Sequence, residues 1–279
     1  MASLQVTTFN LDYTLNSGQL FRFFKRGDVY YVVVGETLFK VKQENNLKNN
    51  EDNTILYFDN ISQEALVTLF SLDKNYAMIY REIGKDPFME GLIQRYHGLR
   101  VIHHDPWECL VSFICASFSN IQKIRYSLDE LSRHFGKLLT LDEVTTHRFP
   151  PWKSLTNKRA LLKARTGFRA RYLYMTNRKL TPSFFDEVKQ LPYQEAKNRL
   201  MEFDGIGEKV ADCILLFSLG FYEAFPVDVW IKRIMEQEYL HKPTPGKKIA
   251  EFGRNYFGRY AGIAQQYLYF HALMKKQGR

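Results

Sequence analysis

Along the first sixty residues, hydrophobic and polar positions form short runs that predict β-strands. Val29–Val34 and Leu38–Val41 are rich in β-branched and aromatic side chains, and a short turn at 35–37 separates them. The segment 43–53 is rich in Asn, Glu, Asp and Lys, which is typical of an exposed hairpin loop. We therefore expect a small antiparallel sheet between Val6 and about Asp59.

From Ser62 onward, the hydrophobic spacing changes to that of amphipathic helices. Ser62 can cap the first helix, and Asp105-Pro106 is typical of the start of a strongly apolar one. The predicted fold class is α+β, with an N-terminal antiparallel sheet domain at 1–85 packed on a mostly α-helical body at 86–279. Further helices are expected over 120–135, 158–174, 182–191 and 194–203.

Charge and cysteine content narrow the classes of partner. The 279-residue chain carries a formal charge of +9, which favours nucleic acid or an anionic membrane surface unless the basic balance is incidental. No apolar run is long enough to span a bilayer, and the N-terminus lacks a signal-peptide pattern. Cys109, Cys115 and Cys213 suit reduced thiols and are too few for a four-thiolate iron–sulfur cluster. We expect an intracellular protein with no membrane partner.

A helix-hairpin-helix motif is predicted over 194–220. Apolar residues recur at helical spacing on both sides of the turn Gly205-Ile206-Gly207. Glycines allow a tight turn and a close approach to a ligand, and the start of the following helix can hold a phosphate. A lone Gly-x-Gly is usually an ordinary turn. Between two amphipathic helices in a basic chain, the pattern favours phosphate binding.

Lys209 follows this turn and admits two interpretations. It is either an exposed lysine paired with Asp212 or Glu208, or a nucleophile whose proton is easily lost at a helix N-terminus. Cys213 lies one turn further on the same face, so the two side chains could border one pocket.

Asp228 lies in the loop at 221–229, which is predicted to contain a catalytic residue. Its position before an apolar run indicates a cap for the helix that continues to Leu240. Capping is compatible with catalysis, since a carboxylate held at a helix start stays ionised and faces whatever approaches that end.

Several motifs, taken together, resemble a known family. The chain is similar to the helix-hairpin-helix, Gly/Pro-rich-loop, Asp superfamily of DNA glycosylases, and within it to the 8-oxoguanine DNA glycosylase/AP lyase family. The resemblance extends over nearly the whole chain, and its motifs lie in order at 17–22, 105–115, 169–172, 205–213, 226–229 and 260–265.

The resemblance implies a mechanism. Lys209 would attack C1′ of the damaged nucleotide, Asp228 would stabilise the charge developing on the sugar, and the resulting Schiff base would permit β-elimination. This chemistry requires no cofactor. A structural metal ion would be held by the backbone carbonyls of Met201, Phe203 and Ile206.

The resemblance also implies a pocket for a flipped base. The carbonyl of Gly18 would accept a hydrogen bond from the N7–H that distinguishes 8-oxoguanine from guanine. Gln265 would read the Watson–Crick edge, and Cys213 and Tyr269 would sandwich the base, with Tyr269 replacing the usual Phe. Without the resemblance, Gly18 is a turn glycine, Gln265 a surface amide and Tyr269 a core side chain.

The sequence departs from the family on the opposite strand. Phe118 stands in place of an Asn, Lys123 replaces one of two arginines, and Trp230 replaces a phosphate-contacting His. We therefore expect a weaker preference for opposite cytosine. The expected DNA-binding residues are Phe118, Asn120, Lys123, Phe168, Arg169, Gly205 and Gly207.

Rival assignments fit less well. Monofunctional relatives lack a lysine at Lys209, and the endonuclease III branch carries an iron–sulfur cluster. A non-catalytic DNA-binding module leaves the joint presence of Lys209 and Asp228 unexplained. The expected partner is double-stranded DNA containing 8-oxoguanine, bound by a monomer, in the cytoplasm of a prokaryote or in a eukaryotic nucleus.

Overall fold

The N-terminal part of the computed structural model is a five-stranded antiparallel sheet of strand order β1-β5-β4-β3-β2. The structure describes residues 1–45, 53–276 and 278. The predicted sheet is confirmed, although it begins at Ala2. The predicted loop at 43–53 includes strand ends on both sides, and its residues 46–52 lie outside the described residues. The strands are β1 (Ala2–Thr7), β2 (Phe23–Arg26), β3 (Val29–Val34), β4 (Thr37–Asn45) and β5 (Asn53–Asp59).

Strand β3 is covered on both faces, which explains its unbroken hydrophobic run. Tyr30 and Val32 point into the core between the sheet and the neighbouring helices. Tyr31 and Val33 point to the other face, where Val144 of a second, two-stranded hairpin covers them. This hairpin, β6 (Leu138–Leu141) and β7 (Val144–His147), comes from the part of the chain predicted to be helical.

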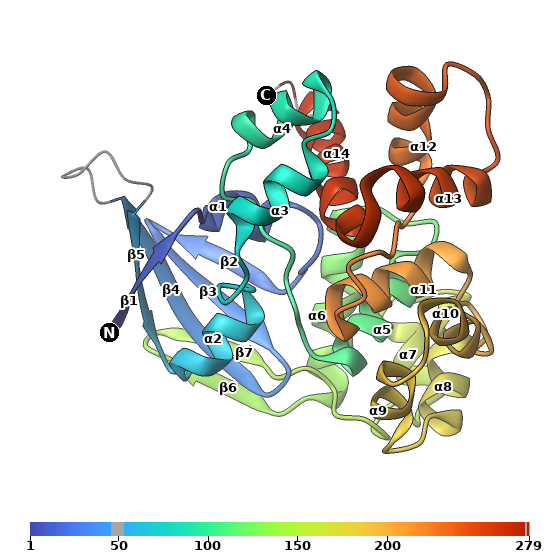
Figure 1. Cartoon of the computed structure of the whole chain (residues 1–279). Helices are drawn as coiled ribbons and strands as arrows, with labels where there is room; N and C mark the ends of the chain where they lie inside the picture. Colours follow the sequence, from blue (N-terminus) through green and yellow to red (C-terminus); the bar gives the residue numbers. More distant parts are fainter. Residues whose placement is uncertain (46–52, 277, 279) are drawn as a thin grey trace.

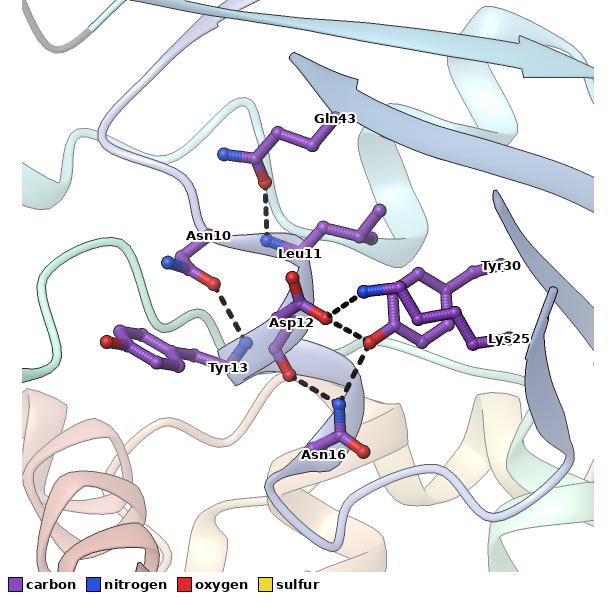
Figure 2. Close-up of polar contacts among 8 residues, drawn as sticks. All are labelled: Asn10, Leu11, Asp12, Tyr13, Asn16, Lys25, Tyr30 and Gln43. Carbon is purple, nitrogen blue, oxygen red and sulfur yellow. Dashed lines mark hydrogen bonds and ion pairs between the residues drawn. The ribbon is translucent and has the colours of Figure 1, made fainter. Parts of the chain in front are cut away.

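A short helix, α1 (Leu11–Asn16), crosses the edge of the sheet and was not predicted. Figure 2 shows the side chains that hold it in place. The Asp12 carboxylate accepts hydrogen bonds from Lys25, at 2.9 Å, and from Tyr30. The amide of Asn16 donates to the same Tyr30 hydroxyl at 3.1 Å, and Gln43 accepts from the backbone of α1. The turn that follows α1 is therefore anchored to the sheet.

The rest of the chain is mostly helical and lies beside the sheet (Figure 1). Together with the sheet, it confirms the predicted α+β fold class. The helices are α2 (Gln63–Leu69), α3 (Tyr76–Ile83), α4 (Pro87–Arg95), α5 (Pro106–Ala116), α6 (Ile121–Phe135), α7 (Lys158–Lys163), α8 (Arg169–Lys179), α9 (Phe184–Lys189), α10 (Tyr193–Met201), α11 (Glu208–Ile214), α12 (Val229–Met235), α13 (Gly246–Phe257) and α14 (Ala261–Lys276).

One predicted helix was wrong. The pattern over 158–174 is divided between α7 and α8, because Arg165 and Gly167 adopt left-handed backbone conformations with φ of +54° and +58°. The capping predictions were confirmed, since Ser62 accepts from the amide of Ala65 and Asp105 accepts from the amide of Glu108.

The described residues form two large hydrophobic cores and a third, small one between the sheet and the β6–β7 hairpin. The sheet core includes side chains of α1 and α2, whereas buried residues of α3, such as Ile79 and Ile83, belong to the large core of the helical body. The boundary at residue 85 stays a prediction. Among the residues that the structure describes, no helix combines the length and hydropathy needed to cross a bilayer.

Candidate active site

Helices α10 and α11 form the predicted helix-hairpin-helix around Gly205 and Gly207. Gly205 has a φ of +85°, and a Cβ there would lie 2.4 Å from a ring atom of Tyr172. Only glycine fits this position. Gly207 is exposed, and a Cβ there would meet nothing within 4 Å. The hairpin therefore has one glycine required by packing and one that leaves open space at the start of α11.

Lys209 lies in the first turn of α11 and is half-buried. Its ammonium lies 5.0 Å from the ring centroid of Phe113 on α5. No carboxylate of the described residues lies within 4.0 Å of it. The interpretation of Lys209 as a lysine paired with Asp212 or Glu208 is wrong, because both of those acids contact Lys197 instead.

Cys213 lies one turn along α11 from Lys209 and is buried. Burial raises the pKa of its thiol to about 11, although the nearby Lys209 ammonium acts in the opposite direction. The thiol is therefore protonated at neutral pH and does not compete with Lys209 as a nucleophile. It offers a compact neutral surface beside the lysine.

Asp228 caps α12, as predicted. One carboxylate oxygen accepts from the backbone amides of Trp230 and Ile231, both at 2.9 Å. The loop before it is tied to α14, since the side-chain amide of Gln265 donates to the carbonyl of Pro226 at 3.0 Å. These contacts fix the direction of the carboxylate, which lies close enough to Tyr269 to influence its ionisation.

The Gly18 turn lies against α14. Gly18 has a φ of +76°, and a Cβ there would lie 3.0 Å from Cε1 of Tyr269. The carbonyl of Ser17 accepts from Gln266 of α14 at 2.8 Å, and the buried amide of Gln19 donates to the carbonyl of Arg100. The sequence around Gly18 and the sequence around Tyr269 contain no pattern that predicts this contact.

Gln265 and Tyr269 lie four residues apart on α14. The side-chain oxygen of Gln265 is buried and has no hydrogen-bond partner among the described residues. Burial raises the pKa of the Tyr269 phenol above its usual range, with the charge of Asp228 adding to the effect. Tyr269 is therefore neutral. Gln265 is buried within the structure, so its interpretation as a surface amide is wrong.

A second surface carries the other predicted DNA contacts. Phe118 is 97% exposed and Phe168 is 54% exposed, and their ring centroids lie 6.5 Å apart. Arg169 stacks over Phe168 at 4.5 Å and donates hydrogen bonds to the carbonyls of Ser117 and Phe118. The guanidinium thus supports the loop that presents Phe118.

Beside these aromatic rings lies a groove of about 550 Å³ that includes Lys123. Lys123 is exposed, and its backbone amide donates to the side chain of Asn120 at 3.0 Å. Asn120 is therefore the cap of α6. Tyr126 and Arg165 also line the groove and were not predicted; their signal, an aromatic and a basic residue, is too common to single them out.

The three carbonyls predicted to hold a metal lie on the hairpin. That of Phe203 accepts from the amide of Ile206 at 3.1 Å, while Met201 lies at the end of α10. The ammonium of Lys179 donates to the adjacent carbonyl of Glu202 at 2.8 Å, and the metal site at the three carbonyls stays a prediction. No group of three or more His, Cys, Asp or Glu in the described part of the chain could hold a metal ion.

Comparisons with known proteins show the family to which the chain belongs. Residues 1–110 match the family model of the 8-oxoguanine DNA glycosylase N-terminal domain. The chain is 31% identical to the N-glycosylase/DNA lyase OGG1 of Arabidopsis thaliana, over 96% of this chain and 78% of the plant protein. It is 33% identical to the N-glycosylase/DNA lyase of Saccharomyces cerevisiae, over 69% of this chain but only 58% of the yeast protein.

The overall structure also has a close counterpart. The crystal structure of the Clostridium acetobutylicum 8-oxoguanine glycosylase/lyase, in complex with dsDNA containing cytosine opposite to 8-oxoG, matches with a TM-score of 0.88 at 30% identity. The match covers 98% of this chain and 96% of that one. The chain therefore belongs to the 8-oxoguanine DNA glycosylase family of N-glycosylase/DNA lyases, within the helix-hairpin-helix superfamily.

Proposed function

We propose that this protein is a bifunctional repair enzyme that removes 8-oxoguanine from duplex DNA and then cleaves the strand. Lys209 is the nucleophile. The observation that carries this assignment is its half-buried amine, which has no carboxylate partner among the described residues and lies beside Cys213. An amine that is not held in an ion pair loses its proton more readily, and the neutral form attacks carbon.

The reaction proceeds in two stages. The nitrogen of Lys209 forms a bond to C1′ as the bond from C1′ to the base breaks, and the base leaves with that electron pair and takes up a proton. Asp228 stabilises the positive charge that develops on the sugar. Ring opening gives a protonated Schiff base, which loses a proton from C2′ as the 3′ phosphate leaves.

Recognition of the lesion depends on the flipped base. The carbonyl of Gly18 accepts a hydrogen bond from N7–H of 8-oxoguanine. In guanine N7 carries a lone pair and no hydrogen, so the buried carbonyl would lose its partner, at a cost of about 1–3 kcal/mol in binding. Cys213 and Tyr269 are both neutral and stack on the two faces of the base. Gln265 contributes a buried oxygen that has no partner and can accept from the Watson–Crick edge.

The opposite strand is read by the second surface. Phe118 or Phe168 fills the space left by the flipped base, and the hairpin glycines bind phosphates. Lys123 offers a point charge in place of a guanidinium fork, which weakens the preference for opposite cytosine. The protein acts as a monomer made of a sheet domain at 1–85 and a glycosylase body at 86–279. The reaction uses no cofactor, and any ion at the hairpin carbonyls is structural.

Two separate readouts test this function. A duplex with one 8-oxoguanine opposite cytosine is incubated with the protein, and the released base is measured by chromatography. The strand is analysed on a denaturing gel with and without alkali. We expect release of 8-oxoguanine but not of guanine, and cleavage without alkali. Base release that requires alkali for cleavage would contradict the lyase activity, and equal release of guanine would contradict the lesion recognition.

A further inference from the structure

The charged residues of α11 are divided between two faces of the helix. Lys209 and Cys213, four residues apart, share the face toward Phe113 of α5. Glu208 and Asp212, also four residues apart, face α10. Asp212 lies three residues from Lys209, a spacing that allows the two side chains to pair directly, whereas Glu208 is adjacent in sequence and can act on the ammonium only through its charge.

Lys197 of α10 holds both acids. Its ammonium is 2.9 Å from Oδ2 of Asp212 and 3.7 Å from Oε2 of Glu208. The other oxygen of Asp212 accepts from the hydroxyl of Tyr193 at 2.6 Å. Lys197 is 4% exposed and Asp212 is 1% exposed. Two charges so deeply buried are retained only when they are paired. This pair joins α10 to α11, the helix that also carries Lys209.

The surroundings of Lys209 are otherwise nearly neutral. Phe113 on α5 carries no charge, and burial raises the pKa values of Cys213 on α11 and Tyr269 on α14. Asp228 is the remaining acid of the site, and one of its oxygens is engaged by two backbone amides. On α10 the ionisable groups that face α11 are Lys197 and Tyr193. Burial raises the pKa of Asp212, whereas these two groups and Arg254 of α13 act to lower it.

A carboxylate paired with Lys209 would hold its amine protonated and suppress attack on C1′. We propose that Lys197 is a positioning residue that holds Asp212 and Glu208 away from Lys209 and so leaves the catalytic amine without a carboxylate partner. Lys197 touches neither the DNA nor the reacting atoms in this scheme. The inference rests on the proposed function, since it requires Lys209 to be the nucleophile.

A graded series of variants tests the inference. The single-turnover rate of 8-oxoguanine release is measured from pH 6 to pH 10. In Lys197→Met both acids lose their lysine partner, although Asp212 keeps the hydrogen bond from Tyr193, so the rising part of the profile moves about one unit to higher pH, with about a tenfold loss near pH 7 and recovery at high pH. Adding Asp212→Asn leaves only Glu208 free and reduces the displacement to about half a unit. Adding Glu208→Gln as well returns the profile to its original position.

The series separates electrostatic from structural effects. A rate lowered by the same factor at every pH in Lys197→Met would overturn the inference, because it would indicate only a damaged fold. If Lys197→Met does not fold, the double variant, which contains no unpaired buried aspartate, replaces it. Identical profiles for the double and triple variants would then overturn the inference.

The proposed function is tested apart from this series by borohydride trapping of the unaltered protein. An adduct that depends on Lys209, with a pH dependence that Lys197→Met leaves unchanged, would overturn this inference alone. The absence of any such adduct would overturn the proposed function and this inference with it.

Discussion

The proposed base pocket and the proposed opposite-strand surface are built in different ways. In the pocket, Gly18, Cys213 and Asp228 come from distant parts of the chain and are fixed by packing and backbone hydrogen bonds. On the opposite-strand surface, Phe118 and Phe168 extend into solvent. The fold itself therefore holds the proposed pocket residues in place, whereas the exposed rings of Phe118 and Phe168 leave most of their surface for a partner to cover.

This difference indicates at which positions substitutions should be tolerated. Bond-making requires groups held within a fraction of an ångström, so a substitution in the pocket is expected to affect rate. An exposed side chain contributes little to folding and can be exchanged at a cost in affinity or specificity only. The departures from the family pattern at Phe118 and Lys123 lie on this exposed surface.

The largest effect is expected for Asp228→Asn. Asparagine caps a helix about as well as aspartate, so the free energy of unfolding should change by less than about 0.5 kcal/mol. Loss of the negative charge beside the developing sugar cation should lower the rate of base release by about 10²–10³-fold. Single-turnover kinetics and thermal unfolding measure the two effects. An unchanged rate would show that Asp228 serves only as a cap.

The next effect is expected for Gly18→Ala. The added methyl group would lie 3.0 Å from Tyr269 and would displace it from the base pocket. We expect the rate on 8-oxoguanine to fall by about 10–100-fold, since a small displacement of a positioning group has effects of this size. Gly27→Ala is the matched control, because Gly27 also has a positive φ of +55° but its Cβ would meet nothing within 4 Å. Equal losses in both variants would point to backbone strain alone.

A smaller effect is expected for Phe118→Ala. At 97% exposure the ring adds little to the stability of the fold, so thermal unfolding should be unchanged. Loss of its stacking in the duplex should weaken DNA binding by about 5–150-fold, corresponding to about 1–3 kcal/mol. Leu138→Ala, at an exposed apolar position on β6, serves as the control in the same titration. If both variants bind DNA as the parent does, Phe118 does not enter the duplex.

The smallest effect is expected for Lys123→Arg. A guanidinium can donate two parallel hydrogen bonds to cytosine, where an ammonium offers one point of contact. The ratio of excision rates opposite cytosine and opposite adenine should rise about fivefold, below the full value of a bidentate contact. The experiment compares four duplexes that differ only in the opposite base. An unchanged ratio would mean that the groove beside Lys123 does not hold the unpaired base.

Local signals in the sequence were sufficient for much of the fold. The two glycines of the hairpin, the caps at Ser62 and Asp105 and the strand at Val29–Val34 depend on neighbouring residues and were predicted correctly. The break between α7 and α8 was missed because Arg165, an ordinary helix former, adopts a left-handed conformation there. The hairpin β6–β7 was missed because its strands are only four residues long.

Contacts between residues that are distant in sequence could not be predicted from such local signals. The contact between Gly18 and Tyr269 joins opposite ends of the chain, and only the family resemblance associated these residues. Lys197 was assigned no role, because its pairing with Asp212 depends on how α10 packs on α11. Asp212 was a usable signal, since an acid on the buried face of a helix requires a partner such as a cation opposite it.

The most direct test of the mechanism is borohydride trapping. The protein is mixed with a duplex holding one 8-oxoguanine opposite cytosine, borohydride is added, and covalent adducts are separated on a denaturing gel. We expect an adduct that requires both the lesion and Lys209, so that undamaged duplex and Lys209→Gln give none while DNA binding persists. An adduct in Lys209→Gln, or none in the unaltered protein under conditions where it binds the duplex, would contradict the assignment of Lys209 as the nucleophile.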